Sequence, residues 1–246
     1  IVDIISDVNL CYSEHARRYL MECGLPKERT FVTGSPMAEV LHANLDKIEA
    51  SNVRQRLGLT KGQYILLSAH REENIDTDRN FVQLFTAVNA MAEKYDMPIL
   101  YSCHPRSRKR LEATGFQLDT RVIAHEPLGF LDYNCLQMNA FAVVSDSGTL
   151  PEESSFFLSV GKPFPAVSIR TSTERPEALD AGCFVLAGID ADSLLQAVEM
   201  AVGMQRAECF GTPVAGYTAE NVSMKVARII QSYTGIVNKM VWRKNG

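Results

Sequence analysis

The sequence predicts an α/β fold over most of its 246 residues, with helices on both faces of a doubly wound parallel sheet. From residue 64 onward, short apolar runs alternate with longer segments of helical periodicity. One run, residues 141–144, is apolar at every position, as strands buried on both faces are. Strands that alternate with helices are typical of a parallel sheet, so we expect a Rossmann-like architecture.

The elements of this sheet can be placed in order. We expect strands at residues 64–69, 98–102, 121–124, 141–145, 165–169 and 183–186. We expect helices at residues 80–95, 107–114, 130–139, 150–159, 194–206 and 219–233. In such a sheet, ligands bind beyond the carboxyl ends of the strands.

The chain also predicts a division into parts. It begins with Ile1 inside what reads as an element, so we expect a fragment of a longer chain. Residues 1–50 hold two expected strands, too few to bury a core, and read as the tail end of an amino-terminal Rossmann-like domain. Residues 51–217 form a second Rossmann-like domain. Residues 218–246 form a carboxyl-terminal helix that packs back toward the first domain.

Composition excludes several classes of protein. A net charge of −4 without a basic stripe argues against nucleic acid as a partner. The apolar runs are too short to span a bilayer, and no signal peptide is visible, so we expect a cytoplasmic protein without a membrane partner. The six cysteines form no C-x-x-C pair, and buried reduced thiols explain them better than a zinc site or disulfides.

The turn after residue 144 predicts a binding site for phosphate. Small residues at 145–148 suit a tight turn, and Thr149 precedes Glu152 at the spacing of a capping box, with Pro151 in the first helical turn. A strand, a small turn and a helix start bring backbone N–H groups and a positive dipole end to one point. The alternative is an ordinary strand-to-helix turn.

Two further polar sets follow neighbouring strands. His70 and Arg71 end the first strand of the sheet, and His104 ends the next, before a proline. Arg71 could clamp an anion, and His70 could bind phosphate or move a proton; a solvated loop with capping bonds is the alternative. The spacing supplies no third ligand, so we reject zinc.

The remaining candidates complete a nucleoside-diphosphate site. Glu153, one turn into the capped helix, could bind two vicinal ribose hydroxyls, and Arg175 could neutralise the phosphates. Phe130 and Tyr133 follow the residue-125 strand end and could line a slot for a base, although core packing explains them equally well. The Walker and Gly-x-Gly-x-x-Gly patterns are absent from the sequence, so ATP and NAD are not indicated.

These motifs resemble the non-hydrolysing UDP-N-acetylglucosamine 2-epimerase family. The resemblance rests on SAHREEN at 68–74, His104-Pro105, DSG at 146–148 with the following Glu152-Glu153, and TERPEALDAG at 173–182. HREENID at 70–76, Thr149 after Gly148, and YSCHPRSRKRLE from residue 101 look closer to the branch that makes UDP-N-acetyl-L-fucosamine from a UDP-linked L-talose precursor.

The resemblance implies the carboxyl-terminal half of a two-domain fold of glycosyltransferase-B type, with residues 51–217 binding UDP. It implies inversion of carbon 2 of a UDP-linked N-acetylhexosamine, by elimination of UDP to a glycal and re-addition. It implies a UDP-sugar substrate, no cofactor and no metal, a homodimer at full length, and a role in capsule or O-antigen polysaccharide synthesis.

It also implies roles for single residues. Matching position by position assigns His70 to catalysis, Ser147, Gly148 and Arg175 to the phosphates, and Glu153 to the ribose. Tyr133 lies where a family aromatic meets the uracil, beside the backbone of Pro127 and Leu128. Arg71 and His104 match positions that contact UDP-sugar in some members, including a regulatory one. Thr149 departs from the pattern, because a second glycine is common there.

The family's acidic catalytic residues lie in the amino-terminal domain, upstream of Ile1. We therefore expect these 246 residues to be inactive alone and to bind UDP weakly or not at all. Two alternatives stay open at this point: a UDP-sugar-dependent glycosyltransferase of the same architecture, and a non-catalytic module that binds UDP-sugar.

Overall fold

The structure is a computed structural model that describes residues 1–75 and 77–244. It divides into two compact units: Ile1–Ala43 with Pro213–Gly246, and Asn44–Thr212. The second unit contains the predicted sheet. The assignment of residues 1–50 to an amino-terminal domain stays a prediction, as does the packing of a helix at 218–246 back toward that domain.

The first unit is small and built around two parallel strands. Its elements are α1 (Val2–Ile5), β1 (Asn9–Cys11), α2 (Glu14–Glu22), η1 (Lys27–Arg29), β2 (Thr30–Val32), the start of α3 (Pro36–Glu49), η2 (Ala215–Tyr217) and α12 (Val222–Met240). The hydroxyl of Ser13 caps α2 by accepting from the Ala16 N–H at 3.1 Å. Gly24, at φ +87°, follows the end of α2.

The second unit alternates strands and helices. Its elements after α3 are α4 (Val53–Arg56), β3 (Ile65–Ser68), α5 (Glu72–Ile75), α6 (Asp78–Tyr95), β4 (Ile99–Ser102), α7 (Pro105–Thr114), β5 (Val122–His125), α8 (Phe130–Asn139), β6 (Ala142–Ser145), α9 (Leu150–Ser159), β7 (Ala166–Ile169), α10 (Pro176–Asp180), β8 (Val185–Ala187) and α11 (Ala191–Arg206). The expected strands and helices are present. The short helices α5 and α10 were not predicted, because four or five residues carry no helical periodicity.

Six strands of the described chain form one sheet in the order β5-β4-β3-β6-β7-β8, and every neighbouring pair is parallel. The chain builds outward from β3 to one edge, then returns to β6 and builds toward the other edge. This order reverses direction between β3 and β6, and that reversal defines the topological switch point of a doubly wound sheet. The predicted fold class is confirmed.

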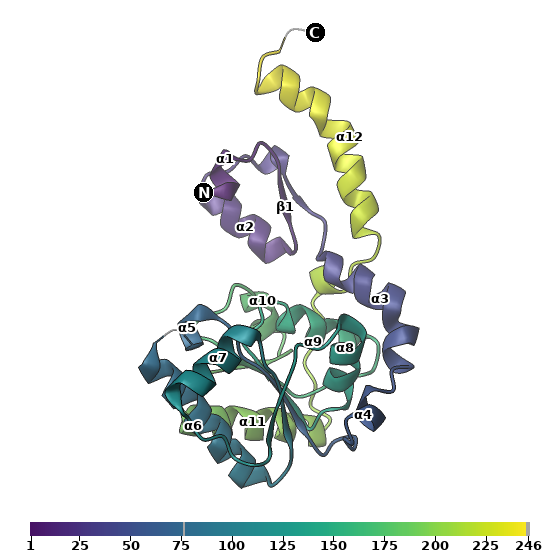
Figure 1. Cartoon of the computed structure of the whole chain (residues 1–246). Coiled ribbons are helices and arrows are strands. Elements are labelled where there is room, and N and C mark those ends of the chain that lie inside the picture. Colours follow the sequence, from purple (N-terminus) through teal and green to yellow (C-terminus); the bar gives the residue numbers. More distant parts are fainter. Residues whose placement is uncertain (76, 245–246) are drawn as a thin grey trace. The chain divides into compact units, whose positions relative to one another are not determined.

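Both faces of the sheet are covered. Side chains alternate along a strand, and Ile65 and Leu67 of β3 join Val144 of β6 in a core with α6 and α11. Figure 1 shows α6 and α11 side by side in this unit. Leu136 of α8 and Phe157 of α9 are also fully buried, but they do not belong to that core cluster. Burial on both faces explains why β3, β6 and β7 are buried at every position.

Among the described residues, none of the helices combines the length and the apolar character needed to cross a membrane. The six cysteines are free thiols. Four are buried as expected, but Cys23 and Cys209 are exposed, so the prediction of buried thiols is wrong for these two.

Candidate functional site

The switch point brings two of the predicted polar segments together. Ser68 and Ser145, the last residues of β3 and β6, lie opposite each other in the parallel pair. The chain continues from them into the loop with His70 and Arg71 and into the turn at residues 146–149. Segments more than seventy residues apart therefore meet at the edge where such sheets bind ligands.

Asp146 ties these two segments together. Its side chain is fully buried, and Oδ2 accepts from the backbone N–H groups of His70 and Arg71, each at 2.8 Å. The amide of Asn74 donates to the same oxygen at 3.2 Å and to the carbonyl of Ile169 at 3.0 Å. These three donors compensate the desolvation of Oδ2, whereas the buried Oδ1 has no hydrogen-bond partner among the described residues. Asp146 thus fixes the loop that presents His70.

His70 itself is half exposed above this anchor. Its Nδ1 lies 3.4 Å from Oδ1 of Asp146 and 3.4 Å from the hydroxyl of Ser68. The carboxylate and the serine hydroxyl orient one side of the ring. The imidazole is held at the switch point yet remains open to a ligand.

The turn into α9 differs from the predicted capping box. Thr149 has helical dihedral angles, and its hydroxyl donates to Oε1 of Glu153 at 2.7 Å instead of accepting from the helix backbone. Glu152 turns away and accepts from Arg175. Within the described residues, no side chain caps the N-terminus of α9. The prediction of the capping box is wrong because both polar side chains find stronger charged partners.

Glu153 is buried on the first turns of α9. Oε1 accepts from Thr149, and Oε2 accepts from the Gln137 amide of α8 at 2.7 Å. Burial raises the pKa of this carboxyl group, which the two hydrogen bonds oppose. Glu153 is therefore held beside the turn by donors from two elements.

Tyr133 of α8 reaches the same place. Burial raises the pKa of its phenol, and the Glu153 carboxylate adds to this rise. Hydrogen bonding with the hydroxyls of Ser145 and Ser68 opposes it. The phenol thus lies at the carboxyl ends of β3 and β6, next to Glu153.

Two arginines border Gly148. A Cβ atom at this glycine would lie 3.4 Å from Nη2 of Arg71 and 3.8 Å from Nη1 of Arg170. Arg170 follows the last residue of β7 and is only 6% exposed. Glu174 accepts from both terminal nitrogens of Arg170, at 2.6 and 2.5 Å, and lies 3.9 Å from Arg71. Two guanidinium groups from different loops therefore border the turn between β6 and α9, with Glu174 as their counter-ion.

Arg175 reaches the same helix from the next loop. Its Nε and Nη2 donate to Oε1 of Glu152 at 3.0 and 2.8 Å, and Glu152 is buried in the first turn of α9. The predicted phosphate arginine therefore lies at the start of α9.

The other predicted residues lie further along the same edge of the sheet. His104 follows β4, is exposed, and caps α7 by accepting from the Arg106 N–H at 3.3 Å. Pro127 and Leu128 follow β5, the strand at the edge of the sheet. These residues are one and two strands away from β3, on the side away from β6.

Sequence reasoning did not single out Asp146, Asn74 and Arg170, which the structure places in the candidate site. Asp146 was treated only as a turn former, although an acid directly after a buried strand is a signal for a buried polar anchor. Arg170 likewise follows an apolar strand, at the same edge as His70. Asn74 carried no such signal, because its two acceptors come from distant segments.

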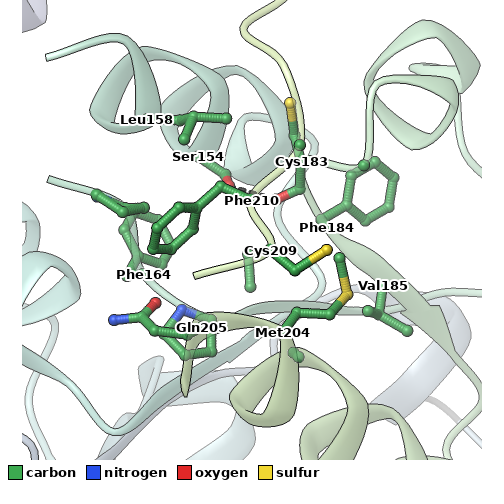
Figure 2. A pocket seen from close by; sticks show the side chains of 16 residues that line it. Ser154, Leu158, Phe164, Cys183, Phe184, Val185, Met204, Gln205, Cys209 and Phe210 are labelled. Atoms are coloured by element: carbon green, nitrogen blue, oxygen red, sulfur yellow. Dashed lines mark hydrogen bonds between the residues drawn. The ribbon is translucent and has the colours of Figure 1, made fainter. Parts of the chain in front are cut away.

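The cavity in Figure 2 is not part of this site. It lies at the amino ends of β7 and β8, where Cys183, Phe184 and Phe164 meet Met204 and Cys209. Its volume is about 40 Å³, room for about one water molecule and far below that of a nucleotide pocket. In residues 1–75 and 77–244, no group of three or more His, Cys, Asp or Glu side chains could hold a metal ion.

Known proteins are similar to this chain in sequence and in fold. The model of the UDP-N-acetylglucosamine 2-epimerase family matches residues 1–231. The UDP-N-acetylglucosamine 2-epimerase of Methanococcus maripaludis is 32% identical over 207 residues, which cover 81% of this chain and 55% of that protein. The corresponding protein of Methanocaldococcus jannaschii is 30% identical over 213 residues, 84% of this chain and 57% of that protein.

Solved structures agree. The UDP-N-acetylglucosamine 2-epimerase of Rickettsia bellii superposes with a TM-score of 0.88 at 39% identity, covering 99% of this chain and 64% of that one. The chain thus spans between half and two thirds of the length of these relatives. The match over residues 1–231 and the geometry of the switch point lead to one conclusion: this chain belongs to the UDP-N-acetylglucosamine 2-epimerase family.

Proposed function

We propose that this chain is the UDP-holding part of a UDP-sugar 2-epimerase, which inverts carbon 2 of a UDP-linked N-acetylhexosamine. The observation that carries the proposal is the convergence of His70, Gly148 and Glu153 at the β3–β6 switch point, with Arg71 and Arg175 beside it. The structure of the related M. jannaschii enzyme in complex with UDP-GlcNAc and UDP supports this ligand class; it superposes with a TM-score of 0.81 at 28% identity, covering 94% of this chain and 62% of that one.

Each group has a physical task in this proposal. The uncapped start of α9 and the residues Ser147 and Gly148 receive the diphosphate, because helix N-termini attract anions. Arg71 and Arg175 supply positive charge there. Glu153, already an acceptor for two donors, exchanges those bonds for the two ribose hydroxyls. Tyr133, Pro127 and Leu128 border the uracil.

The reaction follows from these contacts. Removal of the proton on carbon 2 and rupture of the bond between carbon 1 and the UDP oxygen give a glycal and free UDP. Reprotonation of carbon 2 on the opposite face, with return of UDP to carbon 1, gives the epimer. Because the protein keeps the eliminated UDP bound, its return to carbon 1 does not depend on a second encounter in solution. His70, oriented by Asp146 and Ser68, acts near the diphosphate.

The carboxylates that move the carbon-2 proton belong, in this proposal, to an amino-terminal domain that precedes Ile1. The 246-residue chain then binds UDP weakly and does not epimerise. Two further proposals concern the whole protein: a homodimer and a cytoplasmic location.

The substrate that we propose is the UDP-linked precursor of N-acetyl-L-fucosamine, for capsule or O-antigen synthesis. Thr149 after Gly148 and the HREENID segment support this branch. Asp76, the last residue of that segment, lies outside the described residues. Thr149 bonds Glu153 and so shapes the ribose side of the site.

The experiment uses the chain extended at its amino terminus to the length of its relatives. It is incubated with UDP-N-acetylglucosamine and, separately, with UDP-2-acetamido-2,6-dideoxy-L-talose, and inversion at carbon 2 is followed by NMR. Inversion of the talose compound with UDP retained supports the proposal. Transfer of the sugar to an acceptor with release of UDP would indicate a glycosyltransferase, and binding without either reaction a non-catalytic module. Turnover by residues 1–246 alone would contradict the role given to the preceding domain.

A further inference from the structure

The site contains a buried cation with no role in the assignments above. Arg170 extends from the end of β7, is 6% exposed, and brings Nη1 to 3.8 Å from the Cβ position of Gly148. Arg71 borders the same point from the loop after β3. A phosphate seated against the Gly148 backbone would therefore meet both guanidinium groups.

An internal carboxylate now holds these two groups. The carboxylate of Glu174 accepts hydrogen bonds from both terminal nitrogens of Arg170, and its Oε1 lies 3.9 Å from Nη1 of Arg71. A carboxylate and a phosphate present the same fork of two oxygens to a guanidinium group. Glu174 thus satisfies the arginines in the way that a phosphate oxygen pair would.

We propose that Arg170 is a further diphosphate-binding residue, and that Glu174 is its resident counter-ion, which a diphosphate displaces. The proposal rests on the proposed function and deepens it by one residue and one competing group. It requires that Glu174 can leave, and its side chain is 56% exposed whereas that of Arg170 is 5% exposed. In the exchange, the diphosphate binds the buried guanidinium group of Arg170, and the carboxylate of Glu174 becomes solvated.

The surroundings of Arg170 argue against a purely structural pair. Its Nε is buried without a hydrogen-bond partner among the described residues, and the nearest carboxylate oxygen, of Glu73, is 4.0 Å away. A buried guanidinium group with an unused N–H is costly unless a ligand completes it. A pair that only fixed the loop would not need to border Gly148.

The test measures binding of inorganic pyrophosphate and of UDP to the 246-residue chain by calorimetry. Glu174→Gln keeps the size of the side chain and removes its charge. Because it removes a partly exposed competing ion pair, we expect pyrophosphate affinity to rise about fivefold, while the melting temperature stays equal or falls slightly. Arg170→Lys keeps the charge without the fork, and we expect affinity to fall about tenfold, as for a lost charged hydrogen bond.

Glu199→Gln is the matched control. It breaks an exposed pair with Lys94 at 2.7 Å between α11 and α6, away from the strand ends. We expect this variant to bind pyrophosphate as the unchanged chain does. A rise in pyrophosphate affinity without a rise in melting temperature separates a competing group from a structural one.

Each other outcome is decisive. Equal or weaker pyrophosphate binding by Glu174→Gln, or no binding by any variant, overturns the proposal. If the variants shift pyrophosphate binding as expected but UDP binds no better than pyrophosphate, the inference stands and the proposed function fails. If UDP binds better than pyrophosphate and neither variant alters it, the inference fails and the proposed function stands.

Discussion

Asp146 determines the geometry of the site at the scale of single residues. Its one carboxylate accepts from two backbone N–H groups and a side-chain amide of a loop that lies far away in sequence. These donors are tied to one buried oxygen, so the position of His70 depends on a residue that need not touch a ligand. Glu153 is the second buried acid of the site, and its two donors fix it beside Thr149.

Asp146→Ala tests the first of these acids. The substitution leaves three donors without their acceptor, and we expect the free energy of unfolding to fall by about 3 kcal/mol, in the range for unsatisfied buried groups. Denaturation by urea measures the change. Asp180→Ala, at an exposed position of α10, is the control and should alter stability by less than about 0.5 kcal/mol. Similar losses in both variants would contradict the role of Asp146.

Glu153→Gln tests the second acid through pH. Burial raises the pKa of Glu153 in the folded chain above its ordinary value of 4.5. Between these two pKa values the folded state binds more protons than the unfolded state, so stability falls as pH rises. We expect the unfolding free energy of the unchanged chain to decline from pH 4.5 upward relative to that of Glu153→Gln. Parallel stability curves of the two proteins would contradict this.

Sequence reasoning predicted those residues of the candidate site that lie beside a local sequence pattern. His70, Gly148 and Glu153 lie next to strand ends or a helix start, where pattern and chemistry coincide. Asp146 and Arg170 belong to the site because of partners that lie far away in the sequence. Asp146 accepts from the N–H of His70, and Arg170 borders Gly148. No local sequence pattern encodes such contacts. The capping box was wrong for the same reason: Arg175, 23 residues from Glu152, competes for the carboxylate.

At the scale of elements, the start of α9 is the feature on which the proposed phosphate site depends. Its first turn contains Pro151 and two buried acids with different partners: Glu152 pairs with Arg175, and Glu153 accepts from Gln137. The predicted ranges of α8 and α9 agree with the structure residue for residue, because each is bounded by a strand and a glycine-containing turn. The ends of other elements differ from the predicted ends by several residues, even where a side chain caps the start of the helix, as in α6 and α11.

Gly148→Ala tests this element. A Cβ atom would meet Arg71 and Arg170 at ordinary van der Waals distances, and the backbone of Gly148 is not left-handed. We expect stability to change by less than about 0.5 kcal/mol, whereas the methyl group occupies the space of a bound phosphate and UDP affinity falls about tenfold. Calorimetry and urea denaturation measure the two effects.

Gly203→Ala is the control for that substitution. The residue lies in α11 with nothing within 4 Å of the added atom, so stability should rise by up to about 1 kcal/mol. UDP affinity should stay unchanged. Equal affinities of the Gly148→Ala and Gly203→Ala variants would argue against a phosphate at the turn.

At the scale of the whole molecule, the two units differ in how complete they are. The core cluster lies wholly within Asn44–Thr212, around a six-stranded sheet of the described chain. The unit of Ile1–Ala43 and Pro213–Gly246 has a two-stranded sheet and exposes large apolar side chains, among them Ile1, Ile4, Met240 and Trp242. Two strands by themselves bury too little to be stable alone.

Residues 44–212 expressed alone test this difference. We expect them to unfold cooperatively on heating, because their core is self-contained, and to bind pyrophosphate as the 246-residue chain does. Circular dichroism and calorimetry measure both properties. A broad, non-cooperative transition would show that the other unit is needed for the sheet to form.

The carboxylate of Asp146 also changes how the neighbouring loop should exchange with solvent. The backbone N–H groups of His70 and Arg71 belong to no strand or helix, yet both point at a fully buried oxygen 2.8 Å away. Their hydrogens can leave only when the turn after β6 parts from the loop after β3. The hydrogen-exchange rates of these two amides therefore report how often this contact breaks, and a ligand that contacts both turns should slow both rates together.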